Sequence, residues 1–393
     1  MVVYNIISTF NFTDCLVLIA YSFLAYVFQF YYKNFTRPNK LPGPLPLPIV
    51  ECSYLYTGST RELLESLHKK YGDICEYYLA SSRRILISRP EYVERILAPL
   101  SNDTTFLTRF PYSEGLEELG IAGKGVIVNH DERRKVIEEM PIGAELRPDM
   151  LTSLIVTNTE RDLNNVKLAR EDFSRPMKDA EIRNNLLDAL LGGIETTSNT
   201  FSFLVYYVCL SHQVKKKMID EIDSVFPPNT SFHLKHEDLL KLKYCDAIIN
   251  EIGRIMPIAN EIRRYLENPS EVAGYQWEAG TMIQIYINGI HTNKNHWPNP
   301  EIFDPDRFYK ESANRKMNDK ARHKYSLVTF GGGLRNCPGK KLAIIELLSL
   351  MVVVFGKYDV DLVDINAPLN IKSGSITTCE KLPIRIRPRK LSL

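Results

Sequence analysis

Residues 330–339 read Phe-Gly-Gly-Gly-Leu-Arg-Asn-Cys-Pro-Gly and stand directly ahead of an apolar stretch with a helical pattern. Backbone amides and the N-terminus of a helix favour a deprotonated sulfur at Cys337. The glycines allow the backbone to approach a flat group closely, and Arg335 offers a cation to an acid on that group. Pro338 can begin the helix without losing a needed donor. The pattern is compatible with a sulfur ligand beside a flat group; the alternative is a buried core cysteine after a glycine turn.

This stretch resembles the heme-binding signature of the cytochrome P450 family, Phe-x-x-Gly-x-Arg-x-Cys-x-Gly. Every fixed position is filled, by Phe330, Gly333, Arg335, Cys337 and Gly339. The resemblance implies that the Cys337 thiolate is the axial ligand of the iron in heme (iron protoporphyrin IX). It also implies that the other four residues bind this cofactor, with Arg335 paired to a propionate.

Two further motifs stand in the order that the family has. The segment Glu251-Ile-Gly-Arg254 resembles its Glu-x-x-Arg pair, whose spacing puts both side chains on one face of a helix. Residues 300–308, Pro-Glu-Ile-Phe-Asp-Pro-Asp-Arg-Phe, resemble its Pro-x-x-Phe-x-Pro-x-Arg-Phe segment. The resemblance implies a buried structural triad of Glu251, Arg254 and Arg307, in which loss of the carboxylate would strand two buried charges.

A second ligand for a heme propionate is expected shortly after the Glu-x-x-Arg pair. Arg264 matches the position where the family often places it. Its neighbour Arg263 should point to the opposite face of the same strand, so only one of the two can reach the heme. We expect this one to be Arg264.

The sequence Gly192-Gly-Ile-Glu195-Thr196-Thr lies inside a helical pattern that covers residues 179–210. Two glycines within a helix cost about 2 kcal/mol relative to alanine, and they or side-chain back-bonding can open the helix locally. The segment resembles the family's oxygen-activating (Ala/Gly)-Gly-x-(Asp/Glu)-Thr-Thr motif. The resemblance implies that Thr196 hydrogen-bonds dioxygen or its water and that Glu195 relays protons. The alternative is a glycine pair for close helix packing beside a solvated glutamate.

Residues 15–32, CLVLIAYSFLAYVFQFYY, carry no formal charge and predict a transmembrane helix; a buried core helix or a cleaved signal peptide would be the alternatives. Residues 1–14 contain no Lys or Arg, whereas Lys33, Arg37 and Lys40 follow the helix. The positive-inside rule therefore places the rest of the chain in the cytosol. We expect a membrane anchor over 1–33, a stiff proline-rich linker over 34–48 and one heme domain over 49–393.

The composition is that of a globular protein, with 44% hydrophobic and 24% charged residues and a net charge of +2, and it does not suggest nucleic acid as a partner. Seven dispersed cysteines fit neither a disulfide scaffold nor a zinc or iron–sulfur cluster. The patterns predict a mainly α-helical domain with small β-sheets. We expect a hairpin (74–79 with 84–88), helices (90–97, 179–210, 236–256, and one that follows Pro338 and runs to Val354) and short strands (275–277, 281–286, 376–386).

The resemblance is incomplete around residues 132–147. Residues 123–132 resemble the approach to a helix that carries Trp-x-x-x-Arg in the family, yet the chain's two tryptophans, Trp277 and Trp297, lie elsewhere. A shifted His130-x-x-x-Arg134 pairing is one alternative for this motif. The stretch between Glu132 and Lys178 is too short to hold the distal helices of the family. We therefore expect a cytochrome P450-like fold that lacks these helices. A deletion, a splice form or an error in the gene structure would each give this pattern.

The resemblance implies a single-pass protein of the endoplasmic reticulum membrane, with its catalytic domain in the cytosol. It would insert one oxygen atom from O2 into an apolar organic substrate, with electrons from an NADPH-dependent flavoprotein reductase. The alternative is a truncated, non-catalytic membrane protein that retains part of the fold. A member that isomerises or dehydrates its substrate is disfavoured by Glu195 and Thr196.

Overall fold

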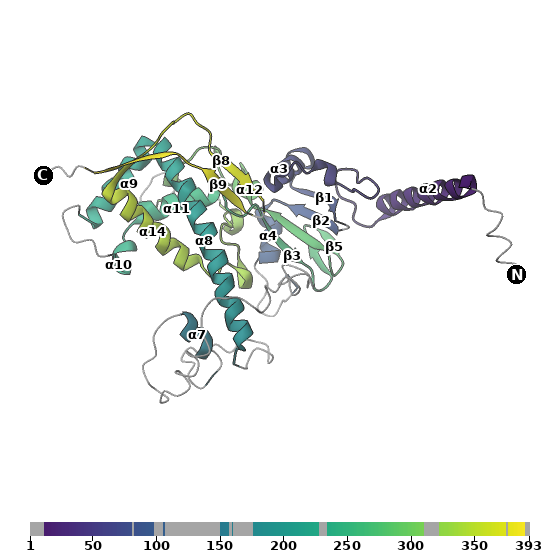
Figure 1. The fold of residues 1–393 in the computed structure, drawn as a ribbon, viewed down its shortest axis with the longest axis horizontal. Helices are drawn as coiled ribbons and strands as arrows, with labels where there is room; N and C mark the ends of the chain where they lie inside the picture. The colour runs from purple at the N-terminus through teal and green to yellow at the C-terminus, as the bar shows by residue number, and fades with distance from the viewer. Residues whose placement is uncertain are drawn as a thin grey trace. The chain divides into compact units, whose positions relative to one another are not determined.

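The computed structural model describes residues 12–80, 82–97, 105–106, 150–156, 159, 176–227, 234–309, 322–374 and 376–389 (Figure 1). The chain forms two compact units, each assembled from separate stretches of sequence. Unit 1 comprises Met1–Arg109, Gly253–Asn336 and Asn370–Glu380, and unit 2 comprises Phe110–Ile252, Cys337–Leu369 and Lys381–Leu393. Helices predominate and the sheets are small, as predicted from the sequence.

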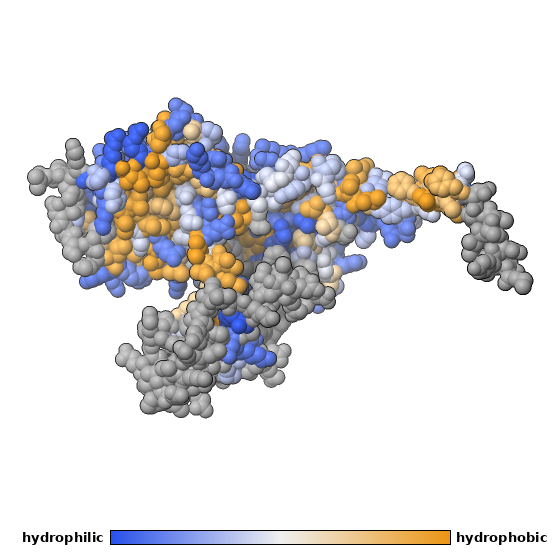
Figure 2. Space-filling model, in the orientation of Figure 1, coloured by the Kyte–Doolittle hydropathy of each residue, from blue (hydrophilic) through white to orange (hydrophobic). Residues whose placement is uncertain are grey.

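The predicted N-terminal helix is confirmed as α2 (Phe12–Thr36), which extends beyond residues 15–32 at both ends. Lys33 lies in its last turn, where a cation complements the helix dipole. Its apolar side chains are exposed along its length (Figure 2), which does not fit the alternative of a buried core helix. By length and composition, α2 can cross a membrane.

Unit 1 is built around a four-stranded sheet with the order β1-β2-β6-β3. The predicted hairpin is confirmed as β1 (Ile74–Leu79) and β2 (Ser82–Ile87), which pair antiparallel; β2 begins two residues earlier than expected. The strand β6 (Met282–Tyr286) pairs parallel to β2 and antiparallel to β3 (Glu261–Tyr265). Strands β2 and β6, which are far apart in the sequence, are therefore neighbours in the sheet.

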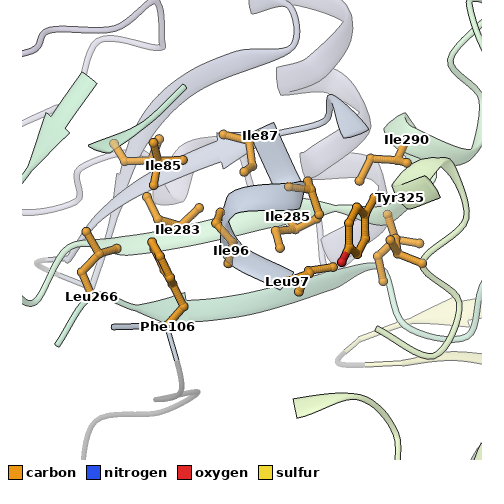
Figure 3. Close-up of a cluster of buried hydrophobic side chains, with 14 of the residues drawn as sticks. Ile85, Ile87, Ile96, Leu97, Phe106, Leu266, Ile283, Ile285, Ile290 and Tyr325 are labelled. Carbon is orange, nitrogen blue, oxygen red and sulfur yellow. The ribbon is translucent and has the colours of Figure 1, made fainter. Parts of the chain in front are cut away.

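One face of this sheet carries the main hydrophobic core of unit 1 (Figure 3). The register places Ile85 opposite Ile283 and aligns the next pair of isoleucines, so branched side chains meet across the strands. The predicted helix α4 (Pro90–Leu97) covers this face with Ile96 and Leu97. Phe106 and further buried side chains complete the cluster.

Smaller elements complete unit 1. Helix α3 (Thr60–Tyr71) is capped by Ser59, whose hydroxyl accepts the Glu62 amide. The short elements are α12 (Ile287–His291), β4 (Ser270–Val272), β5 (Tyr275–Trp277), β8 (Asn370–Ser373) and β9 (Thr377–Lys381). Asn260 ties the returning C-terminal strands to the unit, donating to Ser373 Oγ (2.8 Å) and accepting from Thr377 Oγ1 (3.1 Å).

Unit 2 is mainly helical. Its elements are α7 (Met150–Val156), α8 (Asp179–Leu210), α9 (His212–Val225), α10 (His236–Leu239), α11 (Lys243–Ile255, which runs on into unit 1), α14 (Lys340–Lys357), β7 (Tyr358–Leu362) and β10 (Ile384–Pro388). The bounds predicted for the long helix α8 are confirmed. Strands β7 and β10 pair antiparallel.

The single helix predicted over residues 236–256 is wrong. It is divided into α10 and α11 by a turn at residues 240–242. The Glu221 carboxylate, from α9, accepts the amides of Tyr244 (2.7 Å) and Cys245 (2.9 Å) at the start of α11. This side chain satisfies donors that a new helix N-terminus leaves open, so the break is stabilised by a tertiary contact.

The proline-rich linker is bound to the first hairpin through a buried carboxylate. Glu76 on β1 is 1% exposed and forms ion pairs with Arg37, from the linker, and Arg83, from β2. Arg83 also donates to the Asn39 carbonyl at 2.7 Å. A Cβ added at Gly43 would lie 2.0 Å from the Glu76 carbonyl oxygen, so only glycine fits where the linker crosses β1. The predicted start of the linker is wrong, because residues 34–36 belong to α2, and from Arg37 on the polar groups of the linker are bound by unit 1.

Replacing Glu76 with alanine should leave two largely buried guanidinium groups without their carboxylate. We expect unit 1 to lose about 3 kcal/mol of unfolding free energy. Both tryptophans of the chain, Trp277 and Trp297, lie in unit 1, so urea unfolding followed by their fluorescence reports on this unit. The control is Glu65→Ala, which removes an exposed i,i+4 pair with Lys69 and should cost less than about 0.5 kcal/mol. Equal losses of unfolding free energy in the two variants would contradict the role given to the buried Glu76 carboxylate.

Candidate functional site

The three glycines of the cysteine loop are required by the backbone and by packing inside unit 1. Gly331 and Gly333 have φ values of +74° and +63°, a region that side chains rarely adopt. A Cβ added at Gly332 would lie 3.1 Å from Leu97 Cβ and 3.2 Å from Tyr325 Cε1. The loop would therefore need these glycines even without a macrocycle beside it.

Cys337 follows this loop and directly precedes helix α14. Its thiol is free and partly exposed. The helix begins at Lys340, with Gly339 as its N-cap, so the expectation that Pro338 begins the helix is wrong; Pro338 lies in the turn before it. The sulfur still lies near the positive end of an 18-residue helix. A Cβ at Gly339 would meet Cys337 Sγ at 3.9 Å, an ordinary contact, so local packing does not demand this glycine.

The donor set of the loop fits the group that the sequence implies. One accessible sulfur supplies a single axial ligand, which suits an iron whose other positions are filled by a macrocycle. Arg335, two residues before Cys337, is exposed and offers a cation to an acidic substituent. Phe330 is partly buried at the start of the loop. These residues are compatible with a heme site.

Four other cysteines have thiols that are poor ligands. Burial raises the pKa of Cys75 to about 12 and that of Cys209 to about 11. Burial also raises the pKa of Cys52 and, more strongly, of Cys245. A thiol in an apolar environment resists ionisation because the thiolate loses its hydration.

The register of β3 confirms that Arg263 and Arg264 point to opposite faces of the sheet. Arg264 pairs with Ile283, on the face of the hydrophobic core, and is 2% exposed. Arg263 lies opposite Gln284 and forms an ion pair with Glu261. The Ile262 side chain, on the Arg264 face, lies 3.9 Å from a Cβ built on Gly331. Arg264 thus lies on the same face of β3 as the contact with the cysteine loop, and its role as a propionate ligand stays a prediction.

The Glu-x-x-Arg pair lies on α11, with Glu251 and Arg254 fully buried. The Arg254 guanidinium donates to three backbone carbonyls, those of His291 (3.1 Å), Pro300 (2.7 Å) and Ile302 (3.1 Å). It also lies over the Trp297 ring, 5.4 Å from its centroid. Both arginines of the predicted triad have a structural role toward the segment 291–302, since the buried Arg307 donates to the Asn299 carbonyl at 2.9 Å. The triad itself stays a prediction.

The oxygen-activating motif lies on α8, which is continuous α-helix across it. Thr196 Oγ1 donates back to the Gly192 carbonyl at 2.5 Å, one of the features predicted to loosen the helix. Glu195 is exposed and Thr196 is partly buried. A Cβ added at Gly192 or Gly193 would meet no described atom within 4 Å, so packing against the described residues does not require these glycines.

His291 is a residue that the sequence did not single out. It is fully buried on α12, and its Nε2 accepts the amide of Val328, two residues before Phe330, at 2.9 Å. Burial, and then the positive charge of Arg254, lower the pKa of His291 from its ordinary value of 6.5 to about 3. A histidine between Ile290 and Thr292 gives no sequence signal of this contact.

The predicted site residues are distributed over both units. Unit 1 contains Phe330, Gly333, Arg335, Arg254, Arg264 and Arg307, and unit 2 contains Cys337, Gly339, Glu195, Thr196 and Glu251. His130, Arg134 and the shortened stretch 132–147 lie outside the described residues.

Alkylation at pH 8 should distinguish the cysteines. About one Cys75 thiol in ten thousand is ionised at this pH, and burial also blocks access. We expect iodoacetamide to modify Cys337 and Cys379 at least about 100-fold faster than Cys75 and Cys245, as measured by peptide mass spectrometry. Repeating the reaction in urea should remove the difference. Fast modification of Cys75 without urea would contradict the burial described above.

His291 should make unit 1 less stable in acid. The unfolded chain binds a proton on this ring below about pH 6.5, whereas the folded chain does so only near pH 3. Relative to His291→Gln, which cannot titrate, the wild-type unfolding free energy should fall by up to about 1.4 kcal/mol per pH unit from pH 6 to pH 4. Tryptophan fluorescence in urea measures both proteins. Parallel pH profiles would contradict a buried neutral imidazole.

Comparison of the sequence with known proteins identifies the family of this chain. The chain matches the description "Cytochrome P450" over residues 130–387. It is 32% identical to cytochrome P450 3A9 of Rattus norvegicus over 177 residues, 45% of this chain and 34% of that protein. It is 28% identical to cytochrome P450 3A28 of Bos taurus over 250 residues, 62% of this chain and 46% of that protein. The chain thus spans less than half the length of these two relatives. Because the family match covers more than half of the sequence, the chain belongs to the cytochrome P450 family.

Proposed function

We propose that this chain is a membrane-anchored heme-thiolate monooxygenase. The observation that carries the proposal is Cys337, a partly exposed thiol before the N-terminus of α14, at the ligand position of the family's signature. When bound there, heme would supply the chemistry that activates O2 for insertion of one oxygen atom into an apolar substrate. Cys337 would provide the anionic ligand, and the cations Arg335 and Arg264 would bind the propionates.

Proton delivery is the proposed role of the motif on α8. The exposed Glu195 carboxylate can exchange protons with water, and the Thr196 hydroxyl can hold one at Oγ1. In the structure this hydroxyl donates to the Gly192 carbonyl, so its proton has a defined resting position. Thr196 would turn from that carbonyl to donate the proton held at Oγ1, and Glu195 would replace that proton from water.

The proposed setting is the endoplasmic reticulum membrane. Helix α2 would be a single-pass anchor, with the cationic residues Lys33, Arg37 and Lys40 on the cytosolic side. An NADPH-dependent flavoprotein reductase would supply electrons to the cytosolic domain. The likeness to full-length cytochromes P450 supports this arrangement.

A second candidate function is that of a truncated, non-catalytic membrane protein. It is favoured by the coverage of the relatives, of which the chain spans 34% and 46%. The predicted shortening near residues 132–147 falls where the family has distal helices that roof the substrate. A heme without that roof would release reduced oxygen instead of product.

Carbon monoxide binding separates these functions. The full chain, loaded with heme and reduced, should give the red-shifted Soret band of thiolate ligation, and Cys337→Ala should lose this band completely. Cys379→Ala is the matched control and should keep it, because Cys379 lies outside the signature. Absence of the band at full heme loading would overturn the proposal. A normal band with peroxide release and no oxidised product would favour the truncated protein.

A further inference from the structure

The backbone that leads into the cysteine loop is held by two buried aromatic rings. Trp297 Nε1 donates to the Ser326 carbonyl at 3.1 Å, and His291 Nε2 accepts the Val328 amide at 2.9 Å. Trp297, His291 and Val328 are each 0% exposed. A ring donor and a ring acceptor therefore bind polar groups two residues apart on one short stretch of backbone.

This stretch is directly connected to the conformation of the loop. The Val328 carbonyl accepts the amide of Gly331 at 2.9 Å, closing a turn at the residue where φ becomes +74°. The orientation of the Val328 peptide groups therefore sets the direction in which the chain leaves toward Cys337, nine residues after Val328. We propose that His291 is a positioning residue for the cysteine loop and acts through the Val328 amide.

The backbone at His291 is itself fixed. Its backbone carbonyl accepts Nη1 of the buried Arg254, and α12 ends at this residue. Because Nε2 is an acceptor in this contact, the proton of the neutral ring is on Nδ1. Burial keeps the ring neutral, so the acceptor is present throughout the physiological pH range. This hydrogen bond therefore does not depend on pH in that range.

The hydrogen bond, rather than the volume of the ring, is what positions the loop. An apolar side chain of similar size could fill the space, but it would leave the Val328 amide buried without an acceptor. An unsatisfied buried amide is costly, so the peptide group would turn toward another partner and shift the Gly331 turn. Glutamine can place an acceptor oxygen close to the position of Nε2, whereas leucine cannot.

Amide hydrogen exchange in the heme-free full chain tests this role. We expect His291→Leu to raise exchange in peptides that cover residues 326–336 by about tenfold, while the β1–β2 hairpin stays unchanged. His291→Gln should stay close to wild type. Trp297→Phe, which removes the donor to Ser326 together with part of the buried ring, should raise exchange in the same peptides. Unchanged exchange in His291→Leu, or equal exchange in the leucine and glutamine variants, would overturn the proposal. If His291→Leu fails to fold, His291→Asn, whose shorter amide falls short of Val328, takes its place with the same criteria.

A second experiment measures the effect of His291 on iron ligation by Cys337, and it rests on the proposed function. In heme-loaded protein, His291→Leu should convert at least half of the red-shifted carbon monoxide band to the unshifted form, and His291→Gln should keep it. A full red-shifted band in His291→Leu would overturn a role toward Cys337. If the wild type itself lacks the band, the monooxygenase proposal fails, while the exchange experiment still decides whether His291 positions the loop.

Discussion

Burial of the Arg254 guanidinium is the constraint on which the surroundings of the cysteine loop depend. A charged group without water is stable only if its donors are satisfied. Arg254 meets this requirement with three backbone carbonyls between His291 and Ile302 and with the face of Trp297. These carbonyls must all point inward, which fixes the end of α12 and the irregular chain that follows. The rings of His291 and Trp297 are thereby placed to hold residues 326–328.

Elements with a strong local pattern could be predicted from the sequence. The bounds of α8, the first hairpin and α4 follow from periodicity and from Pro90, which are properties of adjacent residues. The break between α10 and α11 could not be predicted, because the Glu221 carboxylate that caps α11 comes from another helix. The prolines predicted the extended linker. Glu76 gave no sign of its two arginine partners, since a glutamate within a strand is usually solvated.

The candidate site was predictable to a similar extent. A short signature is enough to single out Cys337, and alternation along β3 separates Arg263 from Arg264. The glycines at 331–333 were expected to serve a cofactor, yet their φ values and the proximity of Leu97 already require them. The partners of Arg254 and the role of His291 could not be predicted from the sequence. Both depend on main-chain atoms, which carry no residue-specific signal in a sequence.

The parallel pairing of β2 with β6 has a consequence for biosynthesis. Roughly 200 residues separate the two strands, so at ordinary translation speed β2 leaves the ribosome about 10 to 40 seconds before its partner. During that interval its outer edge is open, and an unpaired edge readily adds strands from other chains. Folding without association between copies therefore requires that this edge stay protected until β6 is available.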